Sequence, residues 1–408
     1  MTVATGMVSD IDPHSRVTVG RLRRPRVVVA GQLPPPLSGQ HIAVQGVLAD
    51  LEADGRFEVV HLPYRFSKAM EQQGRFSLAK LLELPRALLR LLRVRAGGPI
   101  DLLLYPISGT SLGATVRDLV LLPPAYLLSR GTVVQFHGAG QRRWVDDQRC
   151  VVRLAQKVLG RADAAIVHAE ANTVDPETLG IGRVFVVPYR VDDVFDSARL
   201  RRHDLARHTR FLYVGHLGPH RGTPALLDAM ASLAKEQPTV QLELVGSPVG
   251  SFSVAELEGQ IAALGLTDRV RWLGPLDGVP KLDAFGRADL FVFPSVFDAE
   301  SFGLVLVEAL MWGLPIVATD WRANREVLTG ADAIIHDHEP ELAASVTDAL
   351  SRAITLLRTG GWPPFSERNR ALFEERYRRR EGPCLLGDAL ATMLHDDPAT
   401  PLIERHEN

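Results

Sequence analysis

Two glutamates, Glu300 and Glu308, lie on either side of a glycine-bearing segment that is suited to binding a phosphorylated sugar. Glu300 lies in a polar loop, and Glu308 lies in the segment that follows, which is rich in helix-forming residues. The backbone N–H groups of residues 302–304 would then lie at a helix N-terminus, where unpaired donors and the helix dipole attract phosphate. One carboxylate could accept hydrogen bonds from a ribose diol and the other from sugar hydroxyls, with a diphosphate between them.

The elements around the two glutamates place them at one edge of a sheet. Residues 291–293 are an apolar run typical of a buried parallel strand, residues 304–312 have helical composition, and residues 316–318 resemble the next strand. Ligands of such sheets bind at the carboxyl ends of the strands. Two glutamates alone would more often be a helix cap and a solvated helix residue, but this setting favours a functional site.

The segment resembles the signature of the retaining nucleotide-sugar glycosyltransferases of family 4, the glycosyl transferases group 1, which have the two-domain GT-B fold. The matching residues are Pro294-Ser295, Glu300, Phe302-Gly303, Glu308-Ala309, Gly313 and Pro315-Ile316. The loop before Glu300 is slightly longer than in the commonest form. The resemblance is strong over residues 206–345 and thinner, but in register, over residues 26–192.

Short apolar strands alternate with helical segments through both halves of the 408-residue chain, which is long enough for two hydrophobic cores. This pattern predicts an α/β protein with two doubly wound, Rossmann-like domains facing a cleft. We expect a mobile tail over residues 1–24, an acceptor-side domain over 25–205, and a nucleotide-sugar-binding domain over 206–380. Residues 381–408 would form a helix that returns to the first domain, followed by a tail.

Apolar runs and helical periodicity place the individual elements. Strands are predicted at residues 26–30, 57–62, 101–105, 132–136, 164–168, 184–188, 211–215, 240–245, 270–274, 291–293 and 316–318. Helices are predicted at residues 41–51, 78–95, 224–233, 254–264, 281–288, 304–312, 341–357, 364–379 and 383–394.

Two loops of the first half follow predicted strands and could meet the donor. The first carries Ser38 and Gly39, and neither a GxGxxG dinucleotide fingerprint nor a Walker A motif accompanies it. The resemblance implies that its backbone faces the donor diphosphate, although Gln40 replaces a second glycine. The second loop begins with His137, to which the resemblance gives a contact with the donor sugar. The family usually has Asn-Gly where this chain has Tyr189-Arg190.

A loop of the second half, residues 215–222, aligns with the diphosphate-binding pattern G-R-x-x-x-x-K-G. Here His216 replaces the arginine and Arg221 replaces the lysine. Arg221 is a permanent cation that can bind phosphate through two N–H groups, whereas His216 should be mostly neutral at pH 7. Leu276 lies where the backbone of family members reads the base.

The resemblance implies a retaining, metal-independent glycosyltransferase that moves a sugar from a nucleotide-sugar to a hydroxyl of a glycan or lipid-linked acceptor. Such an enzyme would act in cell-surface polysaccharide or glycoconjugate biosynthesis and needs no cofactor. The expected catalytic residues are Glu300, His137 and Arg221. The expected donor-binding residues are Glu308, His216, Ser38, Gly39, Phe302, Gly303, Leu304 and Leu276.

Two other interpretations fit the same residues. A GT-B sugar-nucleotide epimerase or hydrolase would turn over donor without an acceptor. A catalytically degenerate GT-B subunit that serves a partner is suggested by His216, by Tyr189-Arg190 and by Gln40 in place of the second glycine. The retained Glu300, Glu308 and Arg221 argue against it.

Charge and composition indicate where the protein works. The net charge is −2, but residues 1–206 carry 27 Lys and Arg against 20 Asp and Glu, and the remainder has an excess of nine acidic residues. The basic half should meet something anionic, and no nucleic-acid-binding motif accompanies the charge. The two cysteines allow no disulfide framework, and the N-terminal stretch has no apolar core of a signal peptide. We therefore expect a cytoplasmic protein.

One helix could bring this protein to a membrane surface. The predicted helix 78–95 is amphipathic, with leucines on one face and Arg86, Arg90 and Arg93 on another. Such a helix can lie on anionic lipid at the inner face of the plasma membrane, or it can be a surface helix with a solvated face. No apolar run reaches the length of a membrane span, and the longest, 119–128, contains Pro123-Pro124.

Overall fold

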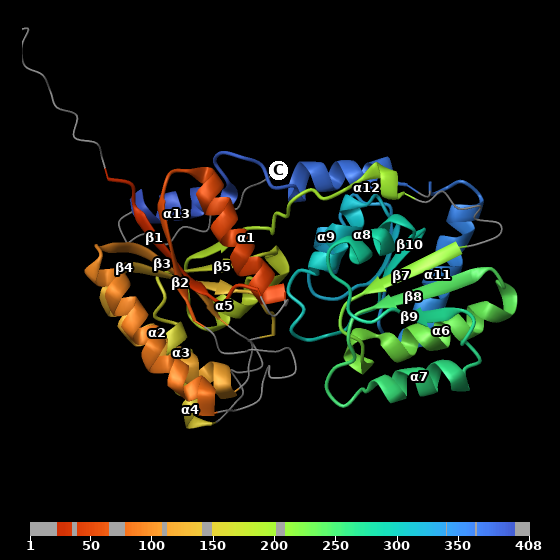
Figure 1. The fold of residues 1–408 in the computed structure, drawn as a ribbon, viewed down its shortest axis with the longest axis horizontal. Helices are drawn as coiled ribbons and strands as arrows, with labels where there is room; N and C mark the ends of the chain where they lie inside the picture. Colours follow the sequence, from red (N-terminus) through yellow and green to blue (C-terminus); the bar gives the residue numbers. More distant parts are fainter. Residues whose placement is uncertain are drawn as a thin grey trace, which may run out of the picture.

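The computed structural model describes residues 23–34, 39–64, 78–107, 112–140, 149–200, 209–339, 341–363 and 365–395. Within these residues the chain forms two six-stranded parallel sheets, side by side in Figure 1, each with helices on both faces. The predicted α/β architecture with two doubly wound domains is confirmed. Ser38 and the tails 1–22 and 396–408 lie outside the described residues.

The first sheet has the strand order β2-β1-β3-β4-β5-β6. Its strands are β1 (Arg26–Gly31), β2 (Glu58–Pro63), β3 (Ile100–Ile107), β4 (Ser129–Phe136), β5 (Ala164–Val167) and β6 (Val184–Val186). Its helices are α1 (Gly39–Asp54), α2 (Leu78–Ala96), α3 (Leu112–Leu128), α4 (Cys150–Leu159) and the short α5 (Val174–Thr178). A short 3₁₀ turn, η3 (Glu170–Asn172), follows β5, and another, η4 (Ser197–Arg199), follows β6.

The second sheet has the order β12-β11-β10-β7-β8-β9. Its strands are β7 (Thr209–Val214), β8 (Val240–Val245), β9 (Val270–Trp272), β10 (Leu290–Phe293), β11 (Ile316–Thr319) and β12 (Ala333–His336). Its helices are η5 (Pro219–Arg221), α6 (Thr223–Glu236), α7 (Val254–Ala263), α8 (Val279–Gly286), α9 (Leu304–Met311), α10 (Asn324–Val327), α11 (Leu342–Arg358) and α12 (Glu367–Leu372). The π-helical turn η6 (Phe373–Tyr377) and α13 (Leu385–His395) end the described chain.

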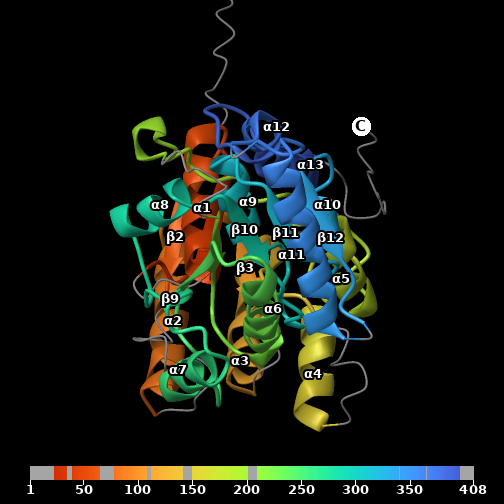
Figure 2. The same cartoon turned by 90° about the vertical axis from the view of Figure 1, so that its right-hand side faces the viewer.

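The strands are apolar on both faces because helices cover both faces of each sheet. In β1, Val28 and Ala30 belong to the core under α2, α3 and α4, whereas Val27 and Val29 belong to the core under α1 and α13. This alternation follows from the two-residue period of a strand. Figures 1 and 2 both place α2, α3 and α4 at the end of the molecule opposite α12 and α13.

The chain crosses between the sheets twice, and the two crossings are hydrogen-bonded to each other. Val191 N–H donates to Tyr377 O at 2.8 Å, and Arg379 N–H donates to Val191 O at 2.9 Å. The Arg379 guanidinium binds Asp50 on α1 and Asp192 in the first crossing, each at 2.6 Å. Helix α13 then packs on α1 through Leu386, Ala389 and Leu390. The crossings are therefore fastened to the first domain.

The structure differs from the predicted elements in a few places. The helix predicted over 364–379 is instead α12 followed by the π-helical turn η6, so its register changes at Phe373. The prolines at 123 and 124 lie inside α3 and do not end it. Helices α3, α4, α5 and α10 and strand β12 were not predicted. Across the part of the chain that the structure describes, no helix combines the length and apolarity needed to cross a bilayer.

Candidate active site between the two domains

Helix α9 presents its uncapped N-terminus at the carboxyl end of β10. Gly303 precedes it in the left-handed conformation, with φ 72° and ψ 62°, and no side chain caps the helix. A side chain at this position would be strained, which explains the glycine. The first N–H groups of the helix have no intrahelical acceptor, so Phe302, Gly303 and Leu304 lie where the sequence predicted a phosphate-binding helix end.

Arg221 and Glu300 meet at this helix end. Arg221 Nη1 donates to Glu300 Oε2 at 2.6 Å, and both side chains are largely shielded from solvent. The guanidinium also lies over the Phe297 ring, 3.8 Å from its centroid. The adjacent Gly222 has φ 74°, and a Cβ there would lie 2.1 Å from Pro294 O. This glycine therefore lets the 218–222 loop approach the strand end and deliver Arg221 to Glu300.

Glu308 pairs with a lysine that belongs to none of the sequence motifs. Lys281 Nζ, on α8, lies 2.6 Å from Glu308 Oε1. The two residues are 27 positions apart on different helices, so no local sequence spacing predicts the pair. The second carboxylate oxygen of Glu308 is buried and has no partner among the described residues.

His216 lies in the same loop system as Arg221 and is neutral at pH 7. Burial and, next, the positive charge of Arg221 lower the pKa of His216 below its ordinary value. Its carbonyl accepts a hydrogen bond from the Tyr213 hydroxyl at 2.6 Å, which fixes the backbone at the end of β7. Leu276 packs partly buried against the core of the second domain.

His137 enters the site from the first domain, at the end of β4. Its Nδ1 lies 2.5 Å from the Tyr189 hydroxyl, and burial lowers the pKa of the His137 imidazole well below its usual range. Its carbonyl accepts a hydrogen bond from Ser301 Oγ at 2.8 Å, and Ala139 N–H donates to Ala299 O at 3.3 Å. The loop that begins with His137 thus contacts the loop that carries Glu300.

Gly39 begins α1, at the first-domain side of the cleft. A Cβ added there would meet no described atom within 4 Å, so contacts within the described residues do not require glycine at this position. Its predicted role toward the donor diphosphate, like that of Ser38, remains a prediction.

Several buried polar atoms at the site have no hydrogen-bond partner within the described part of the chain. They are His137 Nε2, Arg221 Nε, Glu308 Oε2 and Asn324 Oδ1. A buried polar atom without a partner costs about 1–3 kcal/mol, so such atoms tend to mark positions where a ligand binds. Asn324 was not predicted; its Oδ1 lies 3.5 Å from where a Cβ of Gly303 would be, beside the start of α9.

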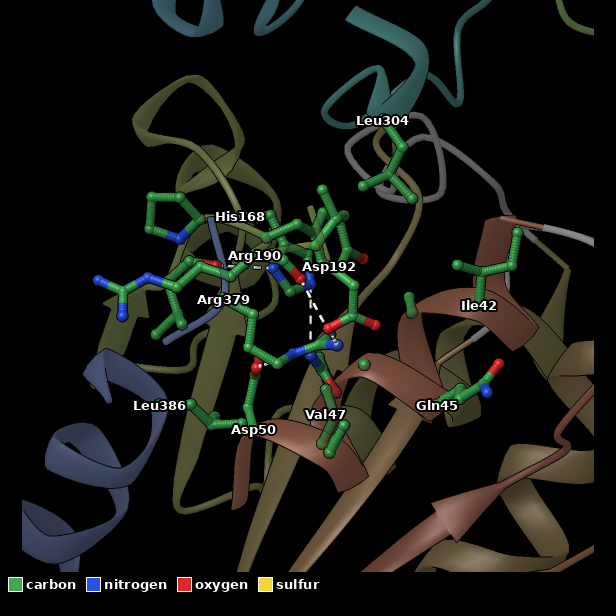
Figure 3. A pocket seen from close by; sticks show the side chains of 18 residues that line it. Ile42, Gln45, Val47, Asp50, His168, Arg190, Asp192, Leu304, Arg379 and Leu386 are labelled. Carbon is green, nitrogen blue, oxygen red and sulfur yellow. Dashed lines mark hydrogen bonds and ion pairs between the residues drawn. The ribbon is translucent and has the colours of Figure 1, made fainter. Parts of the chain in front are cut away.

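A pocket of about 190 Å³ lies between the domains, lined by residues of α1, by Tyr189 and by Leu304 at the start of α9. Figure 3 shows Leu304 of the second domain across this pocket from Ile42, Gln45 and Val47 of α1. The Arg379 side chain lies on the pocket wall, bound to Asp50 and Asp192. The open space of the cleft therefore reaches the N-terminus of α9. Within the described residues, no group of three His, Cys, Asp or Glu side chains could hold a metal ion.

Comparison with known proteins relates part of this chain to a known family. Residues 202–358 match the family model described as glycosyl transferases group 1. The phosphatidyl-myo-inositol mannosyltransferase of Mycobacterium tuberculosis is 34% identical over 201 residues, 48% of this chain and 50% of that protein. The lipopolysaccharide core biosynthesis mannosyltransferase LpsB of Rhizobium meliloti is 28% identical over 262 residues, 58% of this chain and 72% of that protein. The match spans about half the length of the mycobacterial relative.

Solved structures resemble the whole described fold. Sucrose-phosphate synthase from Thermosynechococcus elongatus superposes with a TM-score of 0.68 at 18% identity, covering 91% of this chain and 98% of that one. Anabaena HepE, solved in complex with UDP and glucose, superposes with a TM-score of 0.62 at 17% identity, covering 91% and 99%. Residues 202–358 therefore match the glycosyl transferases group 1 family model, and the chain carries them on the GT-B fold of the solved structures.

Proposed function

We propose that this chain is a retaining glycosyltransferase that moves a sugar from a nucleotide-sugar to a hydroxyl of a glycan or lipid-linked acceptor. The observation that carries the proposal is the meeting of Arg221, Glu300, His137 and the uncapped N-terminus of α9 between the two domains. The matches to a phosphatidyl-myo-inositol mannosyltransferase and to a lipopolysaccharide core mannosyltransferase support an acceptor of the cell envelope.

The donor diphosphate would bind between Arg221 and the first N–H groups of α9. Arg221 keeps an unpartnered Nε–H while its Nη1 binds Glu300, so one guanidinium can hold a phosphate and the carboxylate together. The free Oε2 of Glu308 would accept from a ribose hydroxyl while Lys281 holds Oε1. Each carboxylate is thus neutralised by a cation before the anionic donor arrives.

The chemistry requires no side-chain nucleophile. The bond between the anomeric carbon and the diphosphate oxygen breaks, and its electron pair stays on that oxygen. Arg221 and the α9 N–H groups stabilise the negative charge that develops there, and such preorganised donors often supply the largest catalytic effect. The acceptor oxygen forms its bond to the anomeric carbon on the face that the diphosphate leaves, and its proton passes to a phosphate oxygen. Glu300 positions and stabilises the sugar.

Thermal stabilisation by UDP, GDP, ADP and their sugar conjugates tests the proposal, because a bound ligand raises the apparent stability of the folded state. We expect one nucleoside diphosphate to stabilise the wild type selectively and to lose this effect in Arg221→Ala and Glu308→Ala. Matched controls are Arg352→Ala and Glu258→Ala, on exposed helix faces of the second domain. Stabilisation by none of these ligands would contradict the proposal and favour a degenerate subunit. Donor turnover without an acceptor would favour a hydrolase or epimerase.

We further propose that α2 brings the enzyme to anionic lipid at the inner face of the plasma membrane. Leu84 and Leu91 are buried, whereas Leu89 and Leu92 are about half exposed near Arg86 and Arg93, which are also exposed. Arg90 instead donates to the Glu83 carboxylate at 2.5 Å, so it contributes less free charge. An exposed mixture of leucine and arginine suits a lipid headgroup layer.

Flotation with vesicles that contain anionic lipid tests this membrane contact. We expect the triple variant Arg86→Gln, Arg90→Gln and Arg93→Gln to lose binding. A charge-matched control replaces the exposed arginines at 271, 352 and 380, all in the second half of the chain, by glutamine. Equal flotation of both variants and the wild type would remove the support for a role of α2.

A further inference from the structure

Tyr189 touches both domains at the point where the chain first crosses the cleft. Its ring stacks on His168 of the first domain, with 3.6 Å between ring centroids, and meets the edge of Phe302 of the second domain at 5.3 Å. Its hydroxyl lies 2.5 Å from Nδ1 of His137. This residue therefore joins the candidate sugar-binding histidine to the residue that precedes Gly303 and α9.

The direction of the hydrogen bond between Tyr189 and His137 follows from the partners on either side. Within the described residues the Tyr189 hydroxyl has no other hydrogen-bond partner, and His137 Nε2 is buried without one. If Nδ1–H donated to the hydroxyl, both the hydroxyl proton and the lone pair of Nε2 would be left unsatisfied. If the hydroxyl donates to Nδ1, only the Nε2–H is left over. The second arrangement costs less, because each buried unsatisfied group carries its own penalty.

His168 holds the tyrosine ring in place. Its Nδ1 lies 2.8 Å from Val187 O, and because a carbonyl only accepts, His168 must carry its proton on Nδ1. Its Nε2 then faces the Gln135 amide at 3.4 Å. Burial lowers the pKa of His168 to about 3, so the ring stays neutral. The platform under Tyr189 is thus a fixed, uncharged ring.

We propose that Tyr189 is a positioning residue, whose hydroxyl donates to Nδ1 of His137 and holds His137 as the Nε2–H tautomer. His137 then offers one N–H donor to a hydroxyl oxygen of the donor sugar. This assignment of the sugar contact rests on the proposed function, whereas the tautomer does not. Tyr189 stands where the family usually has asparagine, so this support for the histidine is a property of this chain.

The tautomer is measured directly by nitrogen NMR on protein with ¹⁵N-labelled histidine, with the His137 signal assigned by its loss in His137→Ala. We expect the wild type at neutral pH to carry its proton on Nε2 of His137. In Tyr189→Phe, which retains the stacked ring and removes only the hydroxyl, we expect both tautomers. A proton on Nδ1 in the wild type would overturn the proposal, and so would an unchanged tautomer in the variant. This readout needs no substrate and decides the point even if no nucleotide binds.

The second measurement compares affinities for a nucleoside diphosphate and for its sugar conjugate, using whichever of UDP, GDP or ADP stabilises the wild type. We expect Tyr189→Phe to weaken the sugar conjugate about 5-fold and to leave the nucleoside diphosphate unchanged. In a His137→Ala background the same change should have no further effect. Equal losses in both backgrounds would show that Tyr189 acts elsewhere. The control Tyr126→Phe removes another partly buried hydroxyl of the first domain, which donates to Val158 O at 2.8 Å.

Discussion

Replacing Glu300 by glutamine should tighten the binding of a nucleoside diphosphate while it slows sugar transfer. In the structure the Glu300 carboxylate forms an ion pair with Arg221, the permanent cation that would also bind the diphosphate. Glutamine retains the size of the side chain and an oxygen that accepts a hydrogen bond from Arg221, but it removes the negative charge. The variant therefore relieves the repulsion between the Glu300 carboxylate and the diphosphate, while Arg221 can still bind both groups.

The size of the effect follows from Coulomb's law. Glu300 Oε2 lies 2.6 Å from Arg221 Nη1, so a phosphate on the other side of the guanidinium would lie farther from Glu300. Two unit charges about 6 Å apart repel by roughly 0.7 kcal/mol in water and by about 3 kcal/mol at the effective dielectric constant of a protein surface. Both side chains keep part of their surface in solvent, which favours the lower part of this range. A gain of about 1 kcal/mol corresponds to about 5-fold tighter binding.

Titration calorimetry with the nucleoside diphosphate identified by thermal stabilisation measures this change. Glu308→Gln is the matched variant, because its carboxylate is proposed to accept from the ribose, and its loss should weaken binding about 5-fold. The two glutamates should therefore give changes of opposite sign. Weaker nucleoside diphosphate binding in Glu300→Gln would refute the idea that the charge of Glu300 opposes diphosphate binding. Trapping of a covalent glycosyl–Glu300 adduct would refute its positioning role.

Three further changes probe the site and its support. His216→Arg should tighten nucleoside diphosphate binding about 5-fold at pH 8, because wild-type His216 is neutral at that pH and gains charge only as pH falls. The affinity of the variant should also depend less on pH, which calorimetry at pH 6 and 8 measures. The pKa of His168 is about 3 in the folded state and about 6.5 in the unfolded state, so the free energy of unfolding falls as pH falls through this window. Between pH 7 and 5, the free energy of unfolding measured in urea should therefore fall by about 2 kcal/mol less in His168→Gln than in the wild type. Gly222→Ala should lower the free energy of unfolding by at least about 3 kcal/mol in the same assay, because its Cβ would meet Pro294 O. The control Gly250→Ala, at φ 70° with no atom near its Cβ, should lower it by only about 1 kcal/mol, and equal losses would contradict the packing argument.

The strands were predictable because parallel strands buried on both faces must be continuous apolar runs. Strand β12 was missed because Ala333–His336 is short and lies among polar residues. Helix α3 was missed because Pro123-Pro124 reads as a break, although the structure keeps both prolines inside the helix. The residue composition around Phe373 does not predict the change from α12 to the π-helical turn.

The location of the candidate site could be predicted from the sequence, but the contacts between its side chains could not. The strand-end rule and the family resemblance together brought Arg221, Glu300 and Glu308 to one edge of the second sheet. The pairing of Glu308 with Lys281 depends on how two helices pack, and no sequence spacing encodes it. The bond between His137 and Tyr189 joins residues 52 positions apart in the chain. The sequence resemblance marked Tyr189 only as a departure from the family.

The two ion pairs explain how a cleft that contains two carboxylates can accept an anionic donor. Without Arg221 and Lys281, Glu300 and Glu308 would repel the diphosphate and would themselves resist burial. With these cations in place the unliganded site is close to neutral, and His216 adds no charge at pH 7. Attraction of the diphosphate must then come from the unpartnered Nε–H of Arg221 and from the helix end, which act over short distances. Donor binding by this chain should accordingly depend more on pH and less on salt than binding by a site with a permanent cation at position 216, and a steep salt dependence at pH 8 would contradict this account.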